Sequence, residues 1–308
     1  MAEDKKVFAT PKVRRFAREL GANASLIEGT ERKGRITEED VKKFISNQIK
    51  EPKSTEEDNQ PFSKIKKEYN HSDFGEVEIK DITRVKKLAV PHLVNSWKNI
   101  PHVTHHDEAD ITEMEEFRNS LRDTFTGERR KITPLAFIIK ALVSTLKKFP
   151  TFNSSIEDID KGKMTIKKYY HIGIAVDTTH GLMVPKLRNA NNKNINFISE
   201  ELKTISEKCR NLKINKKEFF GGSMTITSLG GIGGSFFTPI INYPEVAILG
   251  IGRSSEKNIY YESKYQTRMM LPLSLSYDHR IIDGAEAARF CNELKENLGK
   301  NFAYKLAV

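Results

Sequence analysis

A histidine and an aspartate stand four residues apart in the segment LPLSLSYDHRIIDG, which covers residues 271–284. A general base works best when its pKa lies close to the operating pH, so a neutral imidazole is well matched to taking a proton from a thiol. His279 is therefore a candidate general base, and Asp283 is a candidate partner. Both have ordinary structural explanations too: a histidine at a strand end is often only solvated, and Asp283 with Glu286 fits a helix-capping arrangement.

The elements around His279 can be predicted from hydrophobic periodicity. Apolar side chains first occupy every second position, the pattern of a strand, at Leu271, Leu273, Leu275 and Tyr277. They then recur at a spacing of three or four, the pattern of a helix, at Ala287, Cys291, Leu294 and Leu298. The sequence therefore places His279 at a turn between a strand and a helix, close to the N-terminus of that helix.

The motif YDHRIIDG resembles the His-x-x-x-Asp-Gly signature of the dihydrolipoyl acyltransferases, the core components of 2-oxo acid dehydrogenase complexes. The similarity extends through SMTITSLGGIGGSFFTPIINYPEVAILGIG, NIPHVTHHDEADITEMEEFR and ATPKVRRFARELG, so it covers two separate segments of the chain. These stretches are most similar to the acetyltransferases of bacterial pyruvate dehydrogenase complexes. The resemblance implies transfer of an acetyl group from dihydrolipoamide to coenzyme A, with succinyl and branched-chain acyltransferases as alternatives.

The resemblance also assigns roles to individual residues. His279 would be the base, Asp283 would support it, and a hydroxyl 52 residues before the histidine would stabilise the tetrahedral oxyanion. That position holds Thr227, where the family usually has serine. A glycine-rich loop follows, and we expect coenzyme A to lie along it, at Ser228, Gly230, Gly231 and Gly233. The loop does not fit the G-x-G-x-x-G pattern of dinucleotide-binding sites, because Phe236 occupies the position of the third glycine.

Residues 7–46 are expected to form a small all-helical unit. Thr10-Pro11 and Gly21 would start and end its first helix, and Thr37 would open the second. The unit resembles the peripheral-subunit-binding domain of the family, which implies docking of the pyruvate decarboxylase component and of dihydrolipoyl dehydrogenase. Matching position by position, the side chains that face these acidic partners would be Arg14, Arg18 and Arg35. Glu31 departs from the Gly-Thr-Gly loop of the family, and we expect it either to strain the turn or to weaken the basic surface that binds the partner.

Residues 47–73 are polar and charged, which predicts a flexible linker, and residues 1–6 are taken as the remnant of another linker. The family places a lipoyl domain before the docking unit, and the sequence contains none. The lipoyl group is therefore expected on another chain or on a segment that was removed.

Residues 74–308 mix helical and strand patterns, which predicts an α/β domain. Thr133-Pro134 is expected to open a buried helix, and residues 167–178 and 181–187 are expected to form strands on either side of a turn at Gly181. The family implies a chloramphenicol-acetyltransferase-like catalytic domain, with a mixed sheet and flanking helices. It also implies homotrimers that build a hollow cubic core, most similar to the 24-subunit kind. In such a trimer the histidine and the hydroxyl would come from neighbouring subunits.

Composition argues against several other functions. The net charge of +10 is spread along the chain, without the basic block or motif typical of nucleic-acid binding. No apolar run is long enough for a signal segment or a membrane span, and the two cysteines predict no disulfide framework, so we expect a cytoplasmic protein. His102, His105 and His106 do not form a plausible metal site, because they fall on both faces of a predicted strand. A non-catalytic scaffold subunit remains the main alternative to an enzyme.

Overall fold

A computed structural model describes residues 8–32, 34–50, 69–122, 126–261, 263–300 and 302. The chain divides into two compact units, Met1–Ile79 and Lys80–Val308. Each is described by itself. The predicted linker remnant at residues 1–6 and most of the predicted linker, residues 51–68, lie outside the described residues.

The first unit is built on two helices, α1 (Pro11–Glu19) and α2 (Glu38–Lys50), with short 3-10 turns η1 (Ala24–Leu26) and η3 (His71–Asp73). Thr10 caps α1, since its hydroxyl accepts a hydrogen bond from the Val13 amide at 3.4 Å. Leu20, at the C-terminal end of α1, is exposed and does not join the core. A small core remains, formed by Val13, Ala17, Ile27, Ile36 and Val41.

The loop before α2 is held by a buried carboxylate. Asp40 accepts hydrogen bonds from the backbone amides and hydroxyls of Thr30 and Thr37, over distances of 2.8–3.2 Å. Glu31 does not take a left-handed conformation; the positive φ of +73° falls on Gly34. The expected strain at Glu31 is therefore absent, because a glycine three residues later makes the turn.

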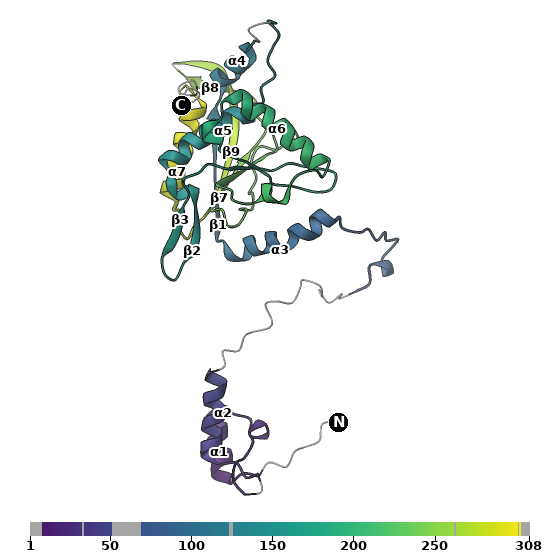
Figure 1. Cartoon of the computed structure of the whole chain (residues 1–308), viewed down its shortest axis with the longest axis vertical. Helices are drawn as coiled ribbons and strands as arrows, with labels where there is room; N and C mark the ends of the chain where they lie inside the picture. The colour runs from purple at the N-terminus through teal and green to yellow at the C-terminus, as the bar shows by residue number, and fades with distance from the viewer. Residues whose placement is uncertain are drawn as a thin grey trace. The chain divides into compact units, whose positions relative to one another are not determined.

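The second unit contains one large mixed sheet and several helices (Figure 1). Its helices are α3 (Arg84–Asn99), α4 (Thr112–Ser120), α5 (Pro134–Lys148), α6 (Ile195–Arg210), α7 (Gly284–Leu298), and the 3-10 turns η4 (Pro150–Asn153), η5 (Ala190–Asn192) and η6 (Lys216–Phe219). Its strands are β1 (His102–Asp110), β2 (Ser154–Asp158), β3 (Lys163–Ile166), β4 (Ile172–Ile174), β5 (Lys186–Leu187), β6 (Met224–Ser228), β7 (Ala247–Ile251), β8 (Ser255–Tyr261) and β9 (Lys264–Asp278).

The large sheet has the order β1-β9-β7-β6-β4-β5, and β8 pairs with the first half of β9. β4, β6 and β7 are parallel to one another, whereas β9 is antiparallel to β1, β7 and β8. β2 and β3 form a separate two-stranded sheet. The predicted class, an α/β unit with a mixed sheet preceded by a helical unit, is confirmed. Residues 167–178 and 181–187 were expected to form strands on either side of Gly181. Regular strand structure there is confined to β4 and β5, with a bridge between Val176 and Met183.

The two faces of the sheet differ in composition. One face carries Leu271, Leu273, Leu275 and Tyr277 and packs in a single core with apolar residues of α5, α6 and α7. The opposite face carries small and polar side chains, among them Ser274, Ser276 and Thr225, all buried. Both faces of β9 are covered. The alternation of apolar and polar side chains in this strand therefore separates an apolar buried face from a polar buried face, and does not separate the interior from solvent.

No helix in the described part of the chain combines the length and the apolar character needed to cross a membrane. Cys209 and Cys291 are buried and free, on α6 and α7, and each contributes a small apolar side chain to the core. Burial raises the pKa of the Cys291 thiol to about 12, so it stays protonated at neutral pH.

Candidate active site

His279 follows directly after β9, at the turn that leads into α7. Its backbone amide donates to the Pro101 carbonyl at 3.1 Å, which ties the turn to the start of β1. Its side chain is exposed in the single chain, and its ring centre lies 6.0 Å from that of Tyr277. The predicted strand-to-helix turn is therefore present, and the imidazole is accessible to a substrate.

Asp283 is the N-cap of α7. Its carboxylate accepts a hydrogen bond from the Glu286 amide at 2.7 Å, which satisfies one of the free amides of the first turn. No hydrogen bond joins Asp283 to His279 within the described residues. The structure thus supports the capping explanation, and the aspartate acts on the site by fixing where the helix begins.

Asp278 and Arg280 flank the histidine and form a two-pronged ion pair. The Arg280 Nε lies 2.9 Å from Asp278 Oδ1, and its Nη2 lies 2.6 Å from Oδ2. The carboxylate is buried, and the side-chain hydrogen bond raises the pKa of Arg280. The pair fixes the backbone on both sides of His279, as expected of a structural ion pair.

Thr227 and the glycine loop lie towards the opposite ends of the strands from His279. Thr227 is partly buried near the end of β6 and faces away from the α5–α7 side, in register with Gly250 of β7 and Ser274 of β9. Ser228 is exposed and accepts a 3.4 Å hydrogen bond from the Gly230 amide. Gly234 has a φ of +87°, a conformation that favours glycine.

The register separates Thr227 from His279 within one chain. Thr227 is level with Ser274, and four residues of β9 lie between Ser274 and His279, so the two positions are five residue steps, or about 17 Å, apart along the strand. The end of β1 and the start of α4 lie towards the same end of the strands as Thr227. The start of β1 lies at the other end, beside His279. One chain therefore cannot bring the two predicted catalytic groups onto the same reacting carbon.

An aromatic ring covers the sheet beside Thr227. A Cβ atom added at Gly250 would lie 2.9 Å from the Phe237 ring, so this ring rests directly on the glycine between Thr227 and Ser274. Sequence reasoning missed Phe237, since nothing in the local pattern shows that the loop folds back over β7.

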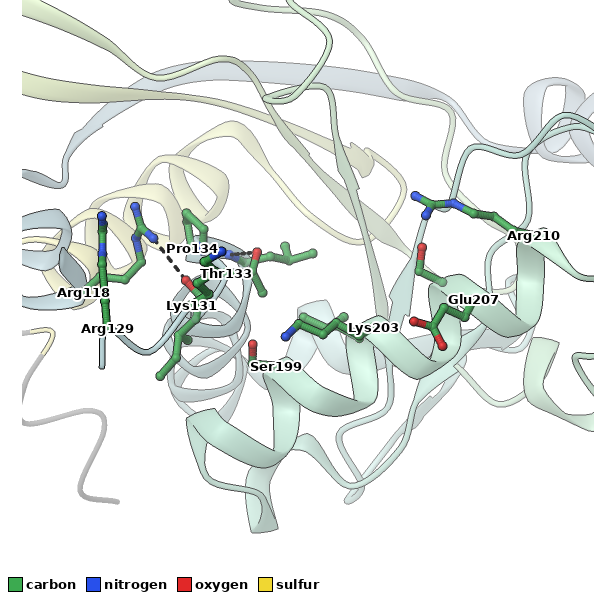
Figure 2. Close-up of a pocket in the computed structure, with 13 residues that line it drawn as sticks. Arg118, Arg129, Lys131, Thr133, Pro134, Ser199, Lys203, Glu207 and Arg210 are labelled. Atoms are coloured by element: carbon green, nitrogen blue, oxygen red, sulfur yellow. Dashed lines mark hydrogen bonds between the residues drawn. The ribbon is translucent and has the colours of Figure 1, made fainter. Parts of the chain in front are cut away.

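Sequence reasoning also missed a basic cavity of about 670 Å³ between α6 and the segment that links α4 to α5 (Figure 2). Among the described residues, its lining carries a single carboxylate, Glu207, and five cationic side chains: Arg118, Arg129, Lys131, Lys203 and Arg210. The available signal was the helical spacing of Ser199, Lys203, Glu207 and Arg210, which places them on one face of α6.

The cations of this cavity differ in how they are engaged. Arg118 is held by Glu115, with Nη2 to Oε2 at 2.6 Å, and donates to the Ile132 carbonyl at 3.1 Å. Within the described residues, the side chains of Lys131, Lys203 and Arg210 have no hydrogen bond or ion pair. Three of the five positive charges are therefore available to an anionic ligand.

Two of the three histidines of β1 form hydrogen bonds with the rest of the domain. The Ile241 amide donates to His102 Nε2 at 3.0 Å, and His102 Nδ1 lies 2.7 Å from the Ile100 carbonyl. His106 Nδ1 lies 2.9 Å from the Ser274 hydroxyl. Within the described residues no cluster of three potential metal ligands occurs.

The model of the family described as "2-oxoacid dehydrogenases acyltransferase (catalytic domain)" matches residues 74–304. The chain belongs to this family. A second model, described as an e3 binding domain, matches residues 7–42, so the two units correspond to two known modules in the order that the sequence suggested.

Several bacterial relatives of this acyltransferase family are similar to the chain. The dihydrolipoyllysine-residue acetyltransferase component of the pyruvate dehydrogenase complex of Cupriavidus necator is 45% identical over 298 residues, which cover 93% of this chain and 53% of that protein. The corresponding component of Haemophilus influenzae is 43% identical, with 93% and 52% covered. The chain spans about half the length of these curated relatives.

Two solved acyltransferase structures share the fold. A dihydrolipoamide acetyltransferase of Azotobacter vinelandii has a TM-score of 0.72 and 42% identity, with 76% of this chain and 96% of that chain covered. That protein was studied for the catalytic role of one serine, one histidine and one asparagine, the serine 52 residues before the histidine and the asparagine four after it. The cubic core of a pyruvate dehydrogenase multienzyme complex has the same TM-score and 43% identity.

Proposed function

We propose that this chain transfers an acetyl group from acetyl-dihydrolipoamide to coenzyme A, as the catalytic and structural core of a pyruvate dehydrogenase complex. The observation that carries the proposal is the spacing of Thr227, His279 and Asp283, because it equals that of the serine, histidine and asparagine of the Azotobacter vinelandii enzyme. Two of the three residue types differ. The hydroxyl is kept at Thr227, and Asp283 can cap a helix as asparagine does.

His279 would act as the general base. A thiol has a pKa of about 8.5, so little thiolate is present at neutral pH. His279 would take the proton of the coenzyme A thiol as the sulfur attacks the thioester carbonyl. The carbonyl oxygen of the tetrahedral intermediate would accept a hydrogen bond from the Thr227 hydroxyl. When the bond to the dihydrolipoyl sulfur breaks, His279 would return its proton to that sulfur.

The site would be shared between neighbouring subunits. His279 and Thr227 of one chain lie towards opposite ends of the strands. In the assembly, His279 of each subunit would therefore lie beside Thr227 of a neighbouring subunit. A closed trimer completes three equivalent sites by this arrangement. We propose such homotrimers as the building block of a 24-subunit core, in line with the similarity to the cubic core.

Coenzyme A carries several phosphates, and the basic cavity offers matching charge. We propose that Lys131, Lys203 and Arg210 receive these phosphates. The pantetheine arm would lie along the glycine loop, at Ser228, Gly230, Gly231 and Gly233, where the glycines permit close backbone approach. An exchange of Lys203 for Ala should raise the KM for coenzyme A several-fold and leave kcat unchanged.

The size of the acyl group would be limited by Phe237. Its ring occupies the space above Gly250 next to the Thr227 hydroxyl, which favours acetyl over succinyl or branched acyl groups. A coupled assay with acetyl-, succinyl- and isobutyryl-dihydrolipoamide tests this preference. Faster transfer of the branched group than of acetyl would contradict it.

The helical unit, for which we propose the bounds 7–46, would recruit the other enzymes of the complex. Arg14, Arg18 and Arg35 are exposed, which suits a surface for the acidic dihydrolipoyl dehydrogenase and pyruvate decarboxylase components. Residues 47–73 would form the linker to a catalytic domain of residues 74–308, and the first part of that segment is helical as far as Lys50. The acyl group would arrive on the lipoyl group of a lipoyl domain.

The proposed complex would work in the cytoplasm, where it would consume the pyruvate that glycolysis produces. Two buried thiols with raised pKa values suit a reducing compartment.

The decisive experiment compares the parent chain with His279→Ala in the acetyl-transfer assay. Loss of the general base should lower kcat by about 10²- to 10⁴-fold, while the assembly stays intact by light scattering. Equal turnover of the two proteins, or no transfer by the parent, would leave a core scaffold as the better description.

A further inference from the structure

A buried ionic network lies on the polar side of the sheet, two residues before Thr227. Lys186 of β5 and Glu245, just before β7, form an ion pair of 2.5 Å with side chains only 1% and 2% exposed. The hydroxyl of Thr225 joins them: it donates to Glu245 Oε2 at 2.6 Å and accepts from Lys186 Nζ at 3.3 Å. Three separate segments of the domain therefore converge on one hydroxyl in β6.

The surrounding backbone is shaped to fit this network. A Cβ atom at Gly173 of β4 would lie 2.4 Å from Thr225 Oγ1 and 2.7 Å from Lys186 Nζ. A Cβ atom at Gly222 would lie 2.1 Å from Glu245 Oε1. Neither glycine has a positive φ, so both are explained by lack of space rather than by backbone conformation. The network thus has little freedom to move.

The network also holds more positive than negative charge. Lys167 is buried beside it and donates to the carbonyls of Ser154 and Gly222 at 3.0 and 2.9 Å. Burial lowers the pKa of Lys167 to about 8, and the nearby Glu245 works in the opposite direction. Two lysines therefore share one glutamate, to which Asn242 adds a neutral hydrogen bond of 3.1 Å.

Stability alone gives a weak account of such a network. Burying charges costs desolvation energy that an ion pair regains only in part, and apolar replacements are often as stable. What the network does supply is a fixed geometry for β6. Side chains alternate between the two faces of a strand, so Thr225 and Thr227 lie on the same face, about 7 Å apart. The hydrogen bonds that hold Thr225 therefore also restrict the backbone that carries Thr227.

We propose that Lys186, Glu245 and Thr225 form a positioning network that aims the Thr227 hydroxyl at the reacting carbonyl. The proposal rests on the acyl-transfer function proposed above, and it adds to that function residues that touch neither substrate. An error of about 1 Å in the placement of a catalytic group can cost as much as 10²-fold in rate. The network would therefore act on the chemical step and leave substrate binding unchanged.

The test is Thr225→Val, which removes the bridging hydroxyl and keeps the β-branched shape. Thr145→Val is the matched control: Thr145 is fully buried on α5 and its hydroxyl also has two partners, the Ala141 carbonyl and the Asn297 amide. We expect Thr225→Val to lower kcat about tenfold, with less than a twofold change in the KM of either substrate. Thr145→Val should lower the melting temperature to a similar extent and leave kcat unchanged.

A double variant shows whether the effect passes through Thr227. If the effect passes through Thr227, the double variant Thr225→Val, Thr227→Val should have the same kcat as Thr227→Val alone, because the hydroxyl that the network positions is already absent. Multiplying effects in the double variant, or a kcat for Thr225→Val within twofold of the parent, would overturn the proposal. Should Thr225→Val fail to assemble, Lys186→Met gives the same readouts, because Lys167 remains to neutralise Glu245.

The same measurements separate this inference from the function on which it rests. If His279→Ala and Thr227→Val both leave the rate unchanged, the acyl-transfer mechanism itself is wrong. If those two variants lose activity while Thr225→Val behaves like Thr145→Val, only the positioning network is wrong.

Discussion

Thr227 differs from the serine of the Azotobacter vinelandii enzyme by one methyl group, which makes its first side-chain torsion stiffer. In the proposed site, the ordered strand and the network at Thr225 would restrict the Thr227 hydroxyl to a narrow range of orientations. A residue that is less free to rotate loses less entropy when it must hold one orientation.

At this site, Thr227→Ser should keep kcat within a few-fold of the parent, because the donor remains. Thr227→Val should lower kcat by about 10²- to 10³-fold, the usual cost of losing one oxyanion donor. Steady-state assays of the three proteins check this order. A fully active Thr227→Val variant would mean that another group stabilises the oxyanion.

Single residues also show how far sequence reasoning can reach. The predicted roles of His279 and Thr227 came from a family motif and a fixed spacing, which can be read from the sequence without knowledge of the fold. Phe237 and Lys186 could not be found in this way. Each acts through a neighbour distant in sequence, Phe237 through Gly250 and Lys186 through Glu245, and only tertiary packing brings them together.

Among the elements, α7 begins where Asp283 caps it. Asp283→Ala should destabilise this helix by about 1 kcal/mol and lower the melting temperature. Asp283→Asn should be close to the parent in both stability and kcat, since asparagine is an equally good N-cap. Calorimetry and the transfer assay measure the two effects. If Asp283→Asn is as inactive as His279→Ala, the carboxylate charge takes part in catalysis.

The stability of the helical unit depends on the ionised carboxylate of Asp40, in the first turn of α2. Burial raises the pKa of Asp40, but hydrogen bonds from Thr37 and Thr30 outweigh this effect and hold the pKa at about 2, below the ordinary 3.8. The ionised Asp40 carboxylate therefore adds about 2 kcal/mol to the free energy of unfolding above about pH 4. This contribution is lost as the pH falls towards 2.

The helical unit should accordingly unfold in acid, and Asp40→Asn should remove most of this pH dependence. Circular dichroism melts of a fragment of residues 1–79 between pH 2 and 6 would show it. Glu39→Gln is the control, because Glu39 is exposed on the same turn. A parent fragment whose stability is flat across this range would contradict the assignment.

Helix boundaries were more predictable than strand lengths. Thr10-Pro11 and Thr133-Pro134 opened helices as expected, because a cap and a first-turn proline act locally. The segment around β4 and β5 was predicted as longer strands, but regular pairing there depends on which neighbours the sheet supplies. Strand order was not accessible for the same reason.

At the scale of the whole molecule, the separation of His279 and Thr227 within one chain predicts how mixed assemblies of two inactive variants behave. His279→Ala and Thr227→Val chains should each be inactive as homotrimers. When the two are co-expressed and assemble at random, about a quarter of the sites should pair an intact histidine with an intact hydroxyl. Activity of the mixed assemblies near this fraction would support a shared site, and none at all would indicate that both groups act within one chain.

In the proposed trimer, the separation of Thr227 from His279 by about 17 Å along β9 would mean that one defective chain affects two active sites. A chain that lacks both groups contributes a defect to the site on either side of it. Placed with two normal chains, it would leave only one working site in the trimer. Such a subunit would be dominant-negative, and a small excess of it in a cell should reduce flux by more than its share of the protein.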